Sequence, residues 1–273
     1  MTIRGQVSTD ALGSALPLNR PAYGYGRPAW TQTDMLAFRY VTDARAAADV
    51  LPEHLELDDH PRAALVFYNY GVSSVGPYRE AIQQIEVTLD GRRANWIRHI
   101  YVTNDNALVG GRELIGNPKL LGAIDFDRSQ ETANGLFQAR LERPSGVPLA
   151  YGVFQPQVFD GPVEGVRETW LGLRRVPALT GGPAALDEYV RTEVEVRAEE
   201  MWRGTGAPAF TGYSALDPLH QIPVVEPVEA VLGINMTLTP VGMESVSVTA
   251  INDHTRAATA HSGAASGASR QIS

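Results

Sequence analysis

Three consecutive stretches between Ala64 and Thr103 have the composition of β-strands, and they limit the folds open to this chain. ALVFYNYGV, AIQQIEVTL and NWIRHIYVT are rich in β-branched and aromatic residues, which fit the surface of a pleated sheet. Asp90 and Gly91 separate the second stretch from the third, and this dipeptide favours a two-residue hairpin turn. The sequence therefore predicts an antiparallel sheet in this region.

More strand-like stretches occur before and after this region. They are MLAFRYV, GLFQARLE, YGVFQPQVF, TWLGLRRV, TEVEVRAEEMW, AVLGINMTLTP and ESVSVTAI. So many short strands separated by turns are typical of a β-barrel or a β-sandwich. We predict an α+β fold that is mainly antiparallel β, with a few peripheral helices.

Helical signals are few. Asp43 can cap a short helix that ends near Val50, because an aspartate side chain accepts a hydrogen bond from the free N–H groups of a first turn. A second helix is predicted in the segment after Pro118, and a third over Ala184–Arg191, behind the sequence GGP.

The two ends of the chain differ in composition from the rest. Residues 1–28 are rich in Gly, Pro and small polar residues, which predicts an extended N-terminal arm. Residues 255–273 consist largely of Ala, Ser and Gly without an apolar period, which predicts a disordered tail. We expect residues 1–254 to form a single domain.

Composition excludes several classes of function. The net charge of −8 over 273 residues argues against a nucleic-acid partner, which would favour a basic face. There is no cysteine, so neither a disulfide nor a thiolate metal site is possible. No apolar run is long enough to cross a membrane, and no signal peptide is evident. We expect a cytoplasmic protein without a membrane partner.

The 23 basic residues comprise 22 arginines and one lysine, Lys119. A GC-rich genome explains a bias toward arginine, and in one interpretation Lys119 is an accidental survivor of that bias. In the other it is a nucleophile, because an amine that loses its proton can form a Schiff base and a guanidinium cannot.

Lys119 lies in the segment GGRELIGNPKLLG. Its glycines permit tight turns, and Leu120 and Leu121 follow the lysine directly. A lysine at the mouth of an apolar pocket is desolvated, which favours the neutral, nucleophilic amine. The alternative is a lysine on a surface turn.

Other catalytic motifs are absent. The six histidines include no pair at the spacing of a zinc protease. The sequence contains neither a GxSxG motif nor a phosphate-binding loop that ends in GK[ST]. We therefore expect no metal and no cofactor.

Four motifs in order resemble the acetoacetate decarboxylase family, and the resemblance covers most of the chain. They are FRYVTD with LPEHLEL, GPYRE, GRELIGNPK and DPLHQIP. Glu80 in the second motif and Lys119 in the third are 119 − 80 = 39 residues apart, a separation that suits the family pattern. The resemblance implies the barrel or cone fold of that family, a keto acid substrate and a homo-oligomer.

The resemblance also implies roles for individual residues. Lys119 would form the imine, Glu80 would be a buried carboxylate beside the reacting carbon, and Arg39 a polar or charged partner in the same pocket. A mutual salt bridge between Arg39 and Glu80 is the structural alternative. Arg112, Tyr78 and Asn69 are further candidates for contacts with the substrate, and Asn69 stands near a position where relatives carry a carboxylate.

One position departs from the family, whose Schiff-base lysine is typically followed by a second lysine. Here Leu120 follows it. If the neighbouring cation activates the lysine, Lys119 is less readily deprotonated than in the family, and Arg112 is the available replacement charge. If desolvation activates it, Leu120 does no harm.

Three functions remain open. The first is decarboxylation of acetoacetate or a similar β-keto acid, in which the imine takes the electrons left by carbon dioxide. The second is a pyruvate aldolase-dehydratase that uses the same imine. The third is a non-catalytic β-barrel that binds a small ligand. An apolar pocket around Glu80 favours the first, and an arginine clamp for a retained carboxylate favours the second.

Overall fold

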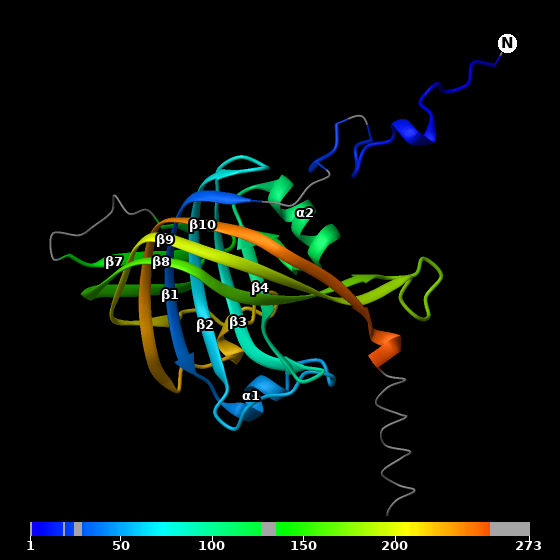
Figure 1. Cartoon of the computed structure of the whole chain (residues 1–273). Helices are drawn as coiled ribbons and strands as arrows, with labels where there is room; N and C mark the ends of the chain where they lie inside the picture. The colour runs from blue at the N-terminus through cyan, green and yellow to red at the C-terminus, as the bar shows by residue number, and fades with distance from the viewer. Residues whose placement is uncertain (1, 19, 25–28, 127–134, 252–273) are drawn as a thin grey trace, which may run out of the picture.

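The computed structural model describes residues 2–18, 20–24, 29–126 and 135–251. Within them ten strands form one sheet in the order β5-β4-β3-β2-β1-β10-β9-β8-β7-β6 (Figure 1). The strands are β1 (Trp30–Val41), β2 (Arg62–Ser73), β3 (Tyr78–Leu89), β4 (Arg92–Val102), β5 (Lys119–Leu121), β6 (Ala123–Asp125), β7 (Phe137–Glu142), β8 (Pro148–Val176), β9 (Leu186–Phe210) and β10 (Glu226–Ser247). The helices with assigned bounds are η1 (Thr9–Ala11), α1 (Ala44–Ala48), α2 (Asp105–Ile115) and η3 (Leu219–Gln221).

The sheet curls until β4 meets β8. These two strands pair in parallel, with Asn95 opposite Trp170 and Trp96 opposite Leu171, and the contact closes β4-β3-β2-β1-β10-β9-β8 into a ring. The strands that follow one another around this ring are otherwise antiparallel. The predicted mainly antiparallel, barrel-like fold is confirmed.

Alternation along the strands separates the inside of the ring from the outside. In β3, Glu80 and Ile82 face inward and Ala81 faces outward, as the two-residue period of a strand requires. The inward residues form an inner core that includes Tyr70 and Val102. The outward residues of β1–β3 pack against β6, β7 and the first part of β8 as an outer core.

Two local predictions are confirmed. Asp90 and Gly91, with φ of 52° and 72°, join β3 directly to β4. Both residues therefore have the positive φ of a type I′ hairpin turn. Asp43 caps α1 by accepting a hydrogen bond from the Ala46 N–H at 2.8 Å, although the helix ends at Ala48 rather than near Val50.

Both other predicted helices are wrong. The segment after Pro118 is strand β5, which pairs in parallel with Ile100–Val102 of β4. Residues 186–191 begin β9 and pair with β8 and β10, because two neighbouring strands are available to them. The stretch predicted as a strand over 244–251 leaves β10 at Ser247, and its last residues are helical.

The helix near the lysine lies before Lys119, not after it. The Asn104 side chain caps α2 by accepting a hydrogen bond from the Ala107 N–H at 3.0 Å, and Gly116 ends it with a φ of 67°. Gly110 and Gly111 lie inside this helix and do not form the tight turn that the sequence predicts for them. An Asn cap and a terminal Gly are ordinary helix signals, but the paired glycines obscure them.

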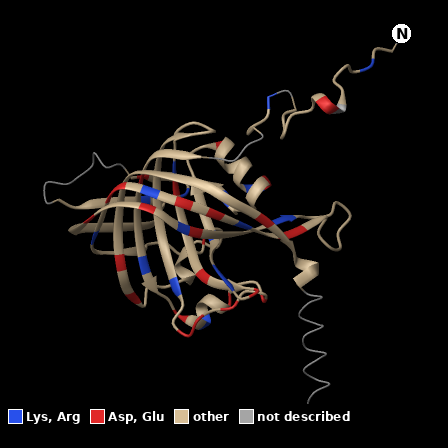
Figure 2. Cartoon of the chain, in the orientation of Figure 1, with Lys and Arg blue, Asp and Glu red and all other residues tan. Residues whose placement is uncertain are grey.

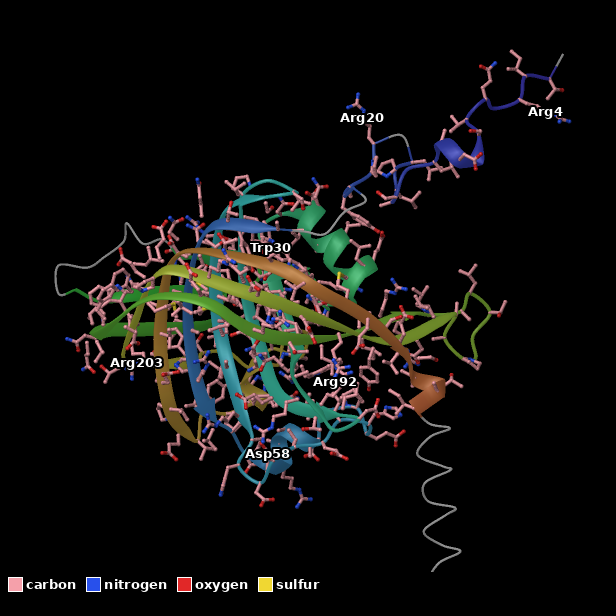
Figure 3. All side chains as sticks on the ribbon, viewed as in Figure 1. Arg4, Arg20, Trp30, Asp58, Arg92 and Arg203 are labelled. Carbon is pink, nitrogen blue, oxygen red and sulfur yellow. The ribbon has the colours of Figure 1, made fainter. Side chains whose placement is uncertain are left out.

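Within the predicted N-terminal arm, Figure 3 places Arg4 and Arg20 well outside the body of the protein. The C-terminal tail predicted at residues 255–273 lies outside the described residues. Acidic and basic residues are interspersed along the strands in Figure 2. Among the described residues, no helix has the length and apolar character needed to span a membrane. The single domain over 1–254 stays a prediction.

Candidate active site

Lys119 is the first residue of β5, and its side chain points into the ring. The chain leaves α2 at Gly116 and joins the edge of β4 two residues after Asn117, where the Lys119 N–H donates to the Asn117 carbonyl at 2.7 Å. The lysine side chain is 6% exposed. An amine in such a position is largely removed from water, as the desolvation argument requires.

Glu80 lies opposite Lys119 on the inward face of β3. The Lys119 Nζ atom is 2.7 Å from Glu80 Oε2, and the glutamate side chain is 4% exposed. The Tyr70 hydroxyl donates to the second carboxylate oxygen, Oε1, at 3.0 Å. A buried ion pair of this kind exchanges hydration for direct contact between the two charged groups.

Aromatic rings enclose the pair. The Lys119 Nζ atom lies 5.6 Å from the centre of the Tyr78 ring, within the range of a cation–π contact. Tyr78 accepts a hydrogen bond from the Trp30 indole at 2.8 Å. Burial, together with the charge of Glu80, raises the pKa of the Tyr70 and Tyr78 hydroxyls well above the ordinary value. Both hydroxyls therefore stay neutral and serve as hydrogen-bonding groups.

The inward path of the lysine depends on Gly111. A Cβ atom built on Gly111 would lie 2.4 Å from Lys119 Cδ and 2.5 Å from Cε. These distances are shorter than the contacts that real Cβ atoms make. The aliphatic part of the Lys119 side chain therefore occupies the space in which any other residue at position 111 would place its Cβ atom. This gives the second glycine of GGRELIGNPK a steric role instead of a turn-forming one.

A cavity of about 370 Å³ opens from Lys119. Its walls are mainly apolar, and among the described residues that line it Lys119 is the only one with a charged side chain. The lining comes from the N-terminal arm, β1, the β2–β3 turn, β3, α2, β5 and β10: Tyr23, Gly24, Trp30, Ser74, Val75, Tyr78, Asn106, Ala107, Gly110, Gly111, Leu114, Ile115, Lys119 and Met243.

The structure does not bring Arg39 to Glu80. The Arg39 side chain is 40% exposed, and its Nη1 atom pairs with Glu229 Oε2 at 2.6 Å. Glu168 lies at 4.0 Å from its Nη2 atom. Arg39 is nine residues beyond Trp30 on β1, roughly 30 Å at about 3.3 Å per residue, so it belongs to the far end of the ring. The proposed mutual salt bridge with Glu80 is absent as well.

Of the remaining candidates, Tyr78 lines the cavity and the other two do not. Arg112 donates from Nη1 to the Lys119 backbone carbonyl at 3.3 Å, so it holds the strand that carries the lysine. Asn69 alternates with the inward Tyr68 and Tyr70 along β2, and it therefore faces the outside of the ring.

Leu120, the departure from the family pattern, also faces away. Its side chain packs against the outer core, on the side of β5 opposite to Lys119. A cation at this position would not point into the cavity.

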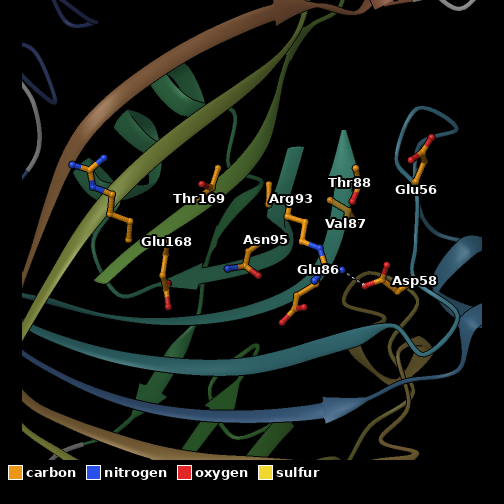
Figure 4. Close-up of a pocket in the computed structure, with 11 residues that line it drawn as sticks. Glu56, Asp58, Glu86, Val87, Thr88, Arg93, Asn95, Glu168 and Thr169 are labelled. Atoms are coloured by element: carbon orange, nitrogen blue, oxygen red, sulfur yellow. Dashed lines mark hydrogen bonds and ion pairs between the residues drawn. The ribbon is translucent and has the colours of Figure 1, made fainter. Parts of the chain in front are cut away.

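The opposite end of the ring holds a different kind of cavity. Figure 4 shows its acidic lining, with Glu56, Asp58, Glu86 and Glu168 around it and the Arg93 side chain directed at Asp58. Its volume is about 270 Å³. Figure 3 shows Asp58 and Trp30 at opposite ends of the sheet. No group of three His, Cys, Asp or Glu side chains suited to a metal ion occurs among the described residues.

Sequence reasoning missed several residues around the lysine. Tyr70, Trp30 and Gly111 contact the site. Tyr70 and Trp30 lie outside the four motifs, and Gly111 lies in GRELIGNPK, where the sequence predicts a turn and not a steric role. Tyr70 could have been found from its alternation with Tyr68 in a predicted strand, which places both on one face. The local sequence does not indicate that Trp30 lies near Lys119, because the position of Trp30 depends on how β1 crosses the ring.

Comparison with known proteins identifies the family of this chain. The family model for acetoacetate decarboxylase (ADC) matches residues 15–246. The chain belongs to the acetoacetate decarboxylase family. Decarboxylase DEC1 of Cochliobolus heterostrophus is 34% identical over 231 residues, which cover 83% of this chain and 91% of that protein.

Solved structures of other proteins share the fold. A structure of acetoacetate decarboxylase superimposes with a TM-score of 0.77 at 22% identity, over 88% of this chain and 98% of the other. The enduracididine biosynthesis enzyme MppR, complexed with the condensation product of pyruvate and imidazole 4-carboxaldehyde, gives a TM-score of 0.71 at 17% identity, over 88% and 98%. At these identities the likeness shows the fold alone.

Proposed function

We propose that this protein is a decarboxylase of a β-keto acid that works through a Schiff base on Lys119. The observation that carries the proposal is the buried contact of 2.7 Å between Lys119 Nζ and Glu80 Oε2 at the end of an apolar cavity. The family membership supports the same reaction class, since the curated relatives that the chain matches are named as decarboxylases.

The first stage forms the imine. As the ketone enters, Glu80 accepts a proton from the Lys119 ammonium, and the free amine attacks the carbonyl carbon. The carbinolamine loses water and leaves a protonated imine. Because Tyr70 also donates to Glu80, the carboxylate keeps one hydrogen bond while it exchanges a proton on its other oxygen.

The second stage breaks the carbon–carbon bond. The electron pair of the bond to the departing carboxylate moves into the imine, carbon dioxide leaves, and an enamine remains. The carbon that lost carbon dioxide takes up a proton from solvent, with Glu80 as the acid that passes it on. Water then hydrolyses the imine, which releases the ketone and restores the Lys119 amine. An apolar cavity favours this step, because charge is spread in the transition state relative to the compact carboxylate of the substrate.

Trapping with borohydride tests the proposal. In the presence of acetoacetate, reduction should add one substrate-derived mass to the protein, and Lys119→Arg should abolish the adduct. Since Lys119 is the only lysine, the N-terminal amine is the single other primary amine, and Lys119→Arg controls for it. Carbon dioxide release from the unreduced enzyme completes the test. No adduct with any of several keto acids would reject imine chemistry.

A pyruvate aldolase-dehydratase is the second candidate, since it needs the same lysine. It must hold a carboxylate throughout the reaction, and no arginine is found among the described residues that line the cavity. This favours loss of carbon dioxide over retention. Enone absorbance with pyruvate plus an aldehyde, in the absence of carbon dioxide release from acetoacetate, would reverse the preference. A non-catalytic binding barrel predicts neither product and no borohydride adduct.

A further inference from the structure

We propose that the keto acid carries an extended linear apolar chain, and that Leu114 and Met243 select for it. The inference rests on the proposed decarboxylation at Lys119 and names the substrate class of the same cavity. It concerns the part of the cavity that lies beyond the reacting carbon.

The first argument is size. A cavity of about 370 Å³ holds the volume of roughly a dozen waters, at about 30 Å³ each. Acetoacetate has only a methyl group beyond its ketone and would leave much of this space to water. Cavities of about 300–1,000 Å³ are those that enclose larger organic ligands.

The second argument is the gradient of burial along the cavity. At its closed end, Lys119, Tyr78 and Trp30 are nearly completely buried. At its mouth, Leu114 and Met243 remain 36% and 42% exposed. Apolar side chains that line an open mouth lose contact with water when an apolar chain covers them, and this burial stabilises the complex.

The third argument is the shape of the wall formed by α2. Ala107, Gly110 and Gly111 line the inner part of the cavity, so this side of the helix carries almost no side-chain volume. Tyr23 from the N-terminal arm packs across the same surface, where a Cβ atom on Gly110 would lie 3.3 Å from its ring. The result is a smooth apolar path from the lysine to Leu114, suited to a straight alkyl chain.

The fourth argument is the absence of charge. Apart from Lys119, no charged side chain lines the cavity among the described residues. A charged tail would lose its hydration without gaining a counter-charge. An alkyl tail has no such cost.

A series of linear substrates tests the proposal. Carbon dioxide release is measured with acetoacetate, 3-oxohexanoate, 3-oxooctanoate and 3-oxodecanoate, after subtraction of the spontaneous rate observed with Lys119→Arg. We expect kcat/KM to rise by roughly fourfold for each methylene that enters the cavity, the factor that corresponds to burying one CH₂ group. The rise should stop when the chain reaches the mouth.

Leu114→Trp and Met243→Trp narrow the mouth. Each should lower the ratio of kcat/KM for 3-oxooctanoate to that for acetoacetate by about tenfold or more, the loss expected when two or more buried methylenes are excluded. Leu179→Trp is the matched control, because Leu179 is fully exposed at the β8–β9 turn and does not line the cavity. It should leave both rates unchanged.

The outcomes separate the two proposals. Equal or falling kcat/KM along the series would overturn the chain-length inference and leave the decarboxylase intact. Carbon dioxide release from none of the four acids would reject the decarboxylase itself. Circular dichroism shows whether each tryptophan variant folds. If one of them does not, the other variant and the substrate series measured on the natural protein still test the chain-length inference.

Discussion

Any other residue at position 111 would add at least a Cβ atom, and this atom would collide with the aliphatic part of the Lys119 side chain. The closest approach would be 2.4 Å, to Lys119 Cδ. Gly111 lies inside α2, where alanine normally stabilises a helix by about 1 kcal/mol relative to glycine. The steric cost and the helix propensity therefore act in opposite directions at this one residue.

Gly111→Ala should displace the Lys119 side chain from Glu80 and reduce borohydride trapping by at least about tenfold, equivalent to roughly 1.4 kcal/mol. The protein should remain folded, because alanine is well tolerated in a helix. Gly110→Ala is the matched control: it adds the same methyl group one residue earlier, facing Tyr23 instead of Lys119. Equal trapping by both variants would contradict the steric role of Gly111.

The ion pair at Lys119 and Glu80 should also contribute to stability as a unit. Lys119→Met and Glu80→Gln each leave one buried partner without its counter-charge, at a cost of about 3–5 kcal/mol. The double variant should cost clearly less than the sum of the two. Urea unfolding measures the coupling. The exposed pair of Arg203 and Asp160 provides the comparison, and a coupling at the buried pair no larger than there would contradict this prediction.

At the scale of elements, the position of Lys119 depends on how α2 docks on β8. Gly116 ends α2 with a φ of 67°, and its carbonyl accepts a hydrogen bond from the Leu173 N–H at 3.1 Å. A Cβ atom at Gly116 would lie 2.4 Å from the Arg174 backbone nitrogen. Gly172 on β8 is equally restricted, with 2.3 Å to the Ile115 carbonyl oxygen. Two glycines therefore set the distance between the helix and the strand.

Gly116→Ala should destabilise the protein by more than the cost of a positive φ alone, which is about 1–2 kcal/mol. Gly165→Ala measures the cost of a positive φ without a steric clash. Gly165 has a φ of 72°, and no neighbouring atom lies within 4 Å of an added Cβ. The excess for Gly116→Ala over Gly165→Ala measures the docking of α2 on β8. Equal free energies of unfolding, determined in urea, would show that the close approach does not matter.

Over the whole molecule, the inner core and the outer core lie on opposite faces of the same strands. The inner core carries the Lys119 cavity, and the outer core packs the other face of β1–β3 against β6–β8. Edge strands β5 and β6 end the sheet. The homo-oligomer implied by the resemblance to the family stays a prediction, as does the cytoplasmic location.

The stability of the whole molecule should fall in mild acid because of His99. Burial, with the charge of Arg98, lowers the pKa of His99 to about 4 from its ordinary 6.5. Between these two pH values the unfolded chain binds a proton that the folded protein does not, so stability is lost as the pH falls through this window, by roughly 2–3 kcal/mol. Urea unfolding at pH 7 and pH 4.5 measures the loss.

His99→Gln should remove most of this pH dependence, because glutamine does not titrate. The same replacement at the exposed His60 is the control and should leave the slope in place. An unchanged slope in His99→Gln would assign the acid sensitivity to other groups.

The sequence by itself determined much of the local structure. The strands of the first half, the hairpin at Asp90 and Gly91 and the cap at Asp43 follow from the properties of the residues themselves, because each depends on neighbours in sequence. The single lysine and its distance from Glu80 directed attention to two residues that the structure brings to within 2.7 Å of each other. The resemblance to known motifs added the chemistry that spacing alone does not supply.

The tertiary structure decided the rest. The paired glycines predicted a turn where a helix forms, and Gly111 instead leaves room for the Lys119 side chain. Residues 186–191 became strand because β8 and β10 flank them. Arg39 faces inward like the residues around Lys119, yet its distance along β1 puts it at the opposite end of the ring. Local alternation fixes which face of a sheet a side chain occupies. Only the long-range pairing of strands fixes which side chains meet, and that pairing is not encoded by any single segment.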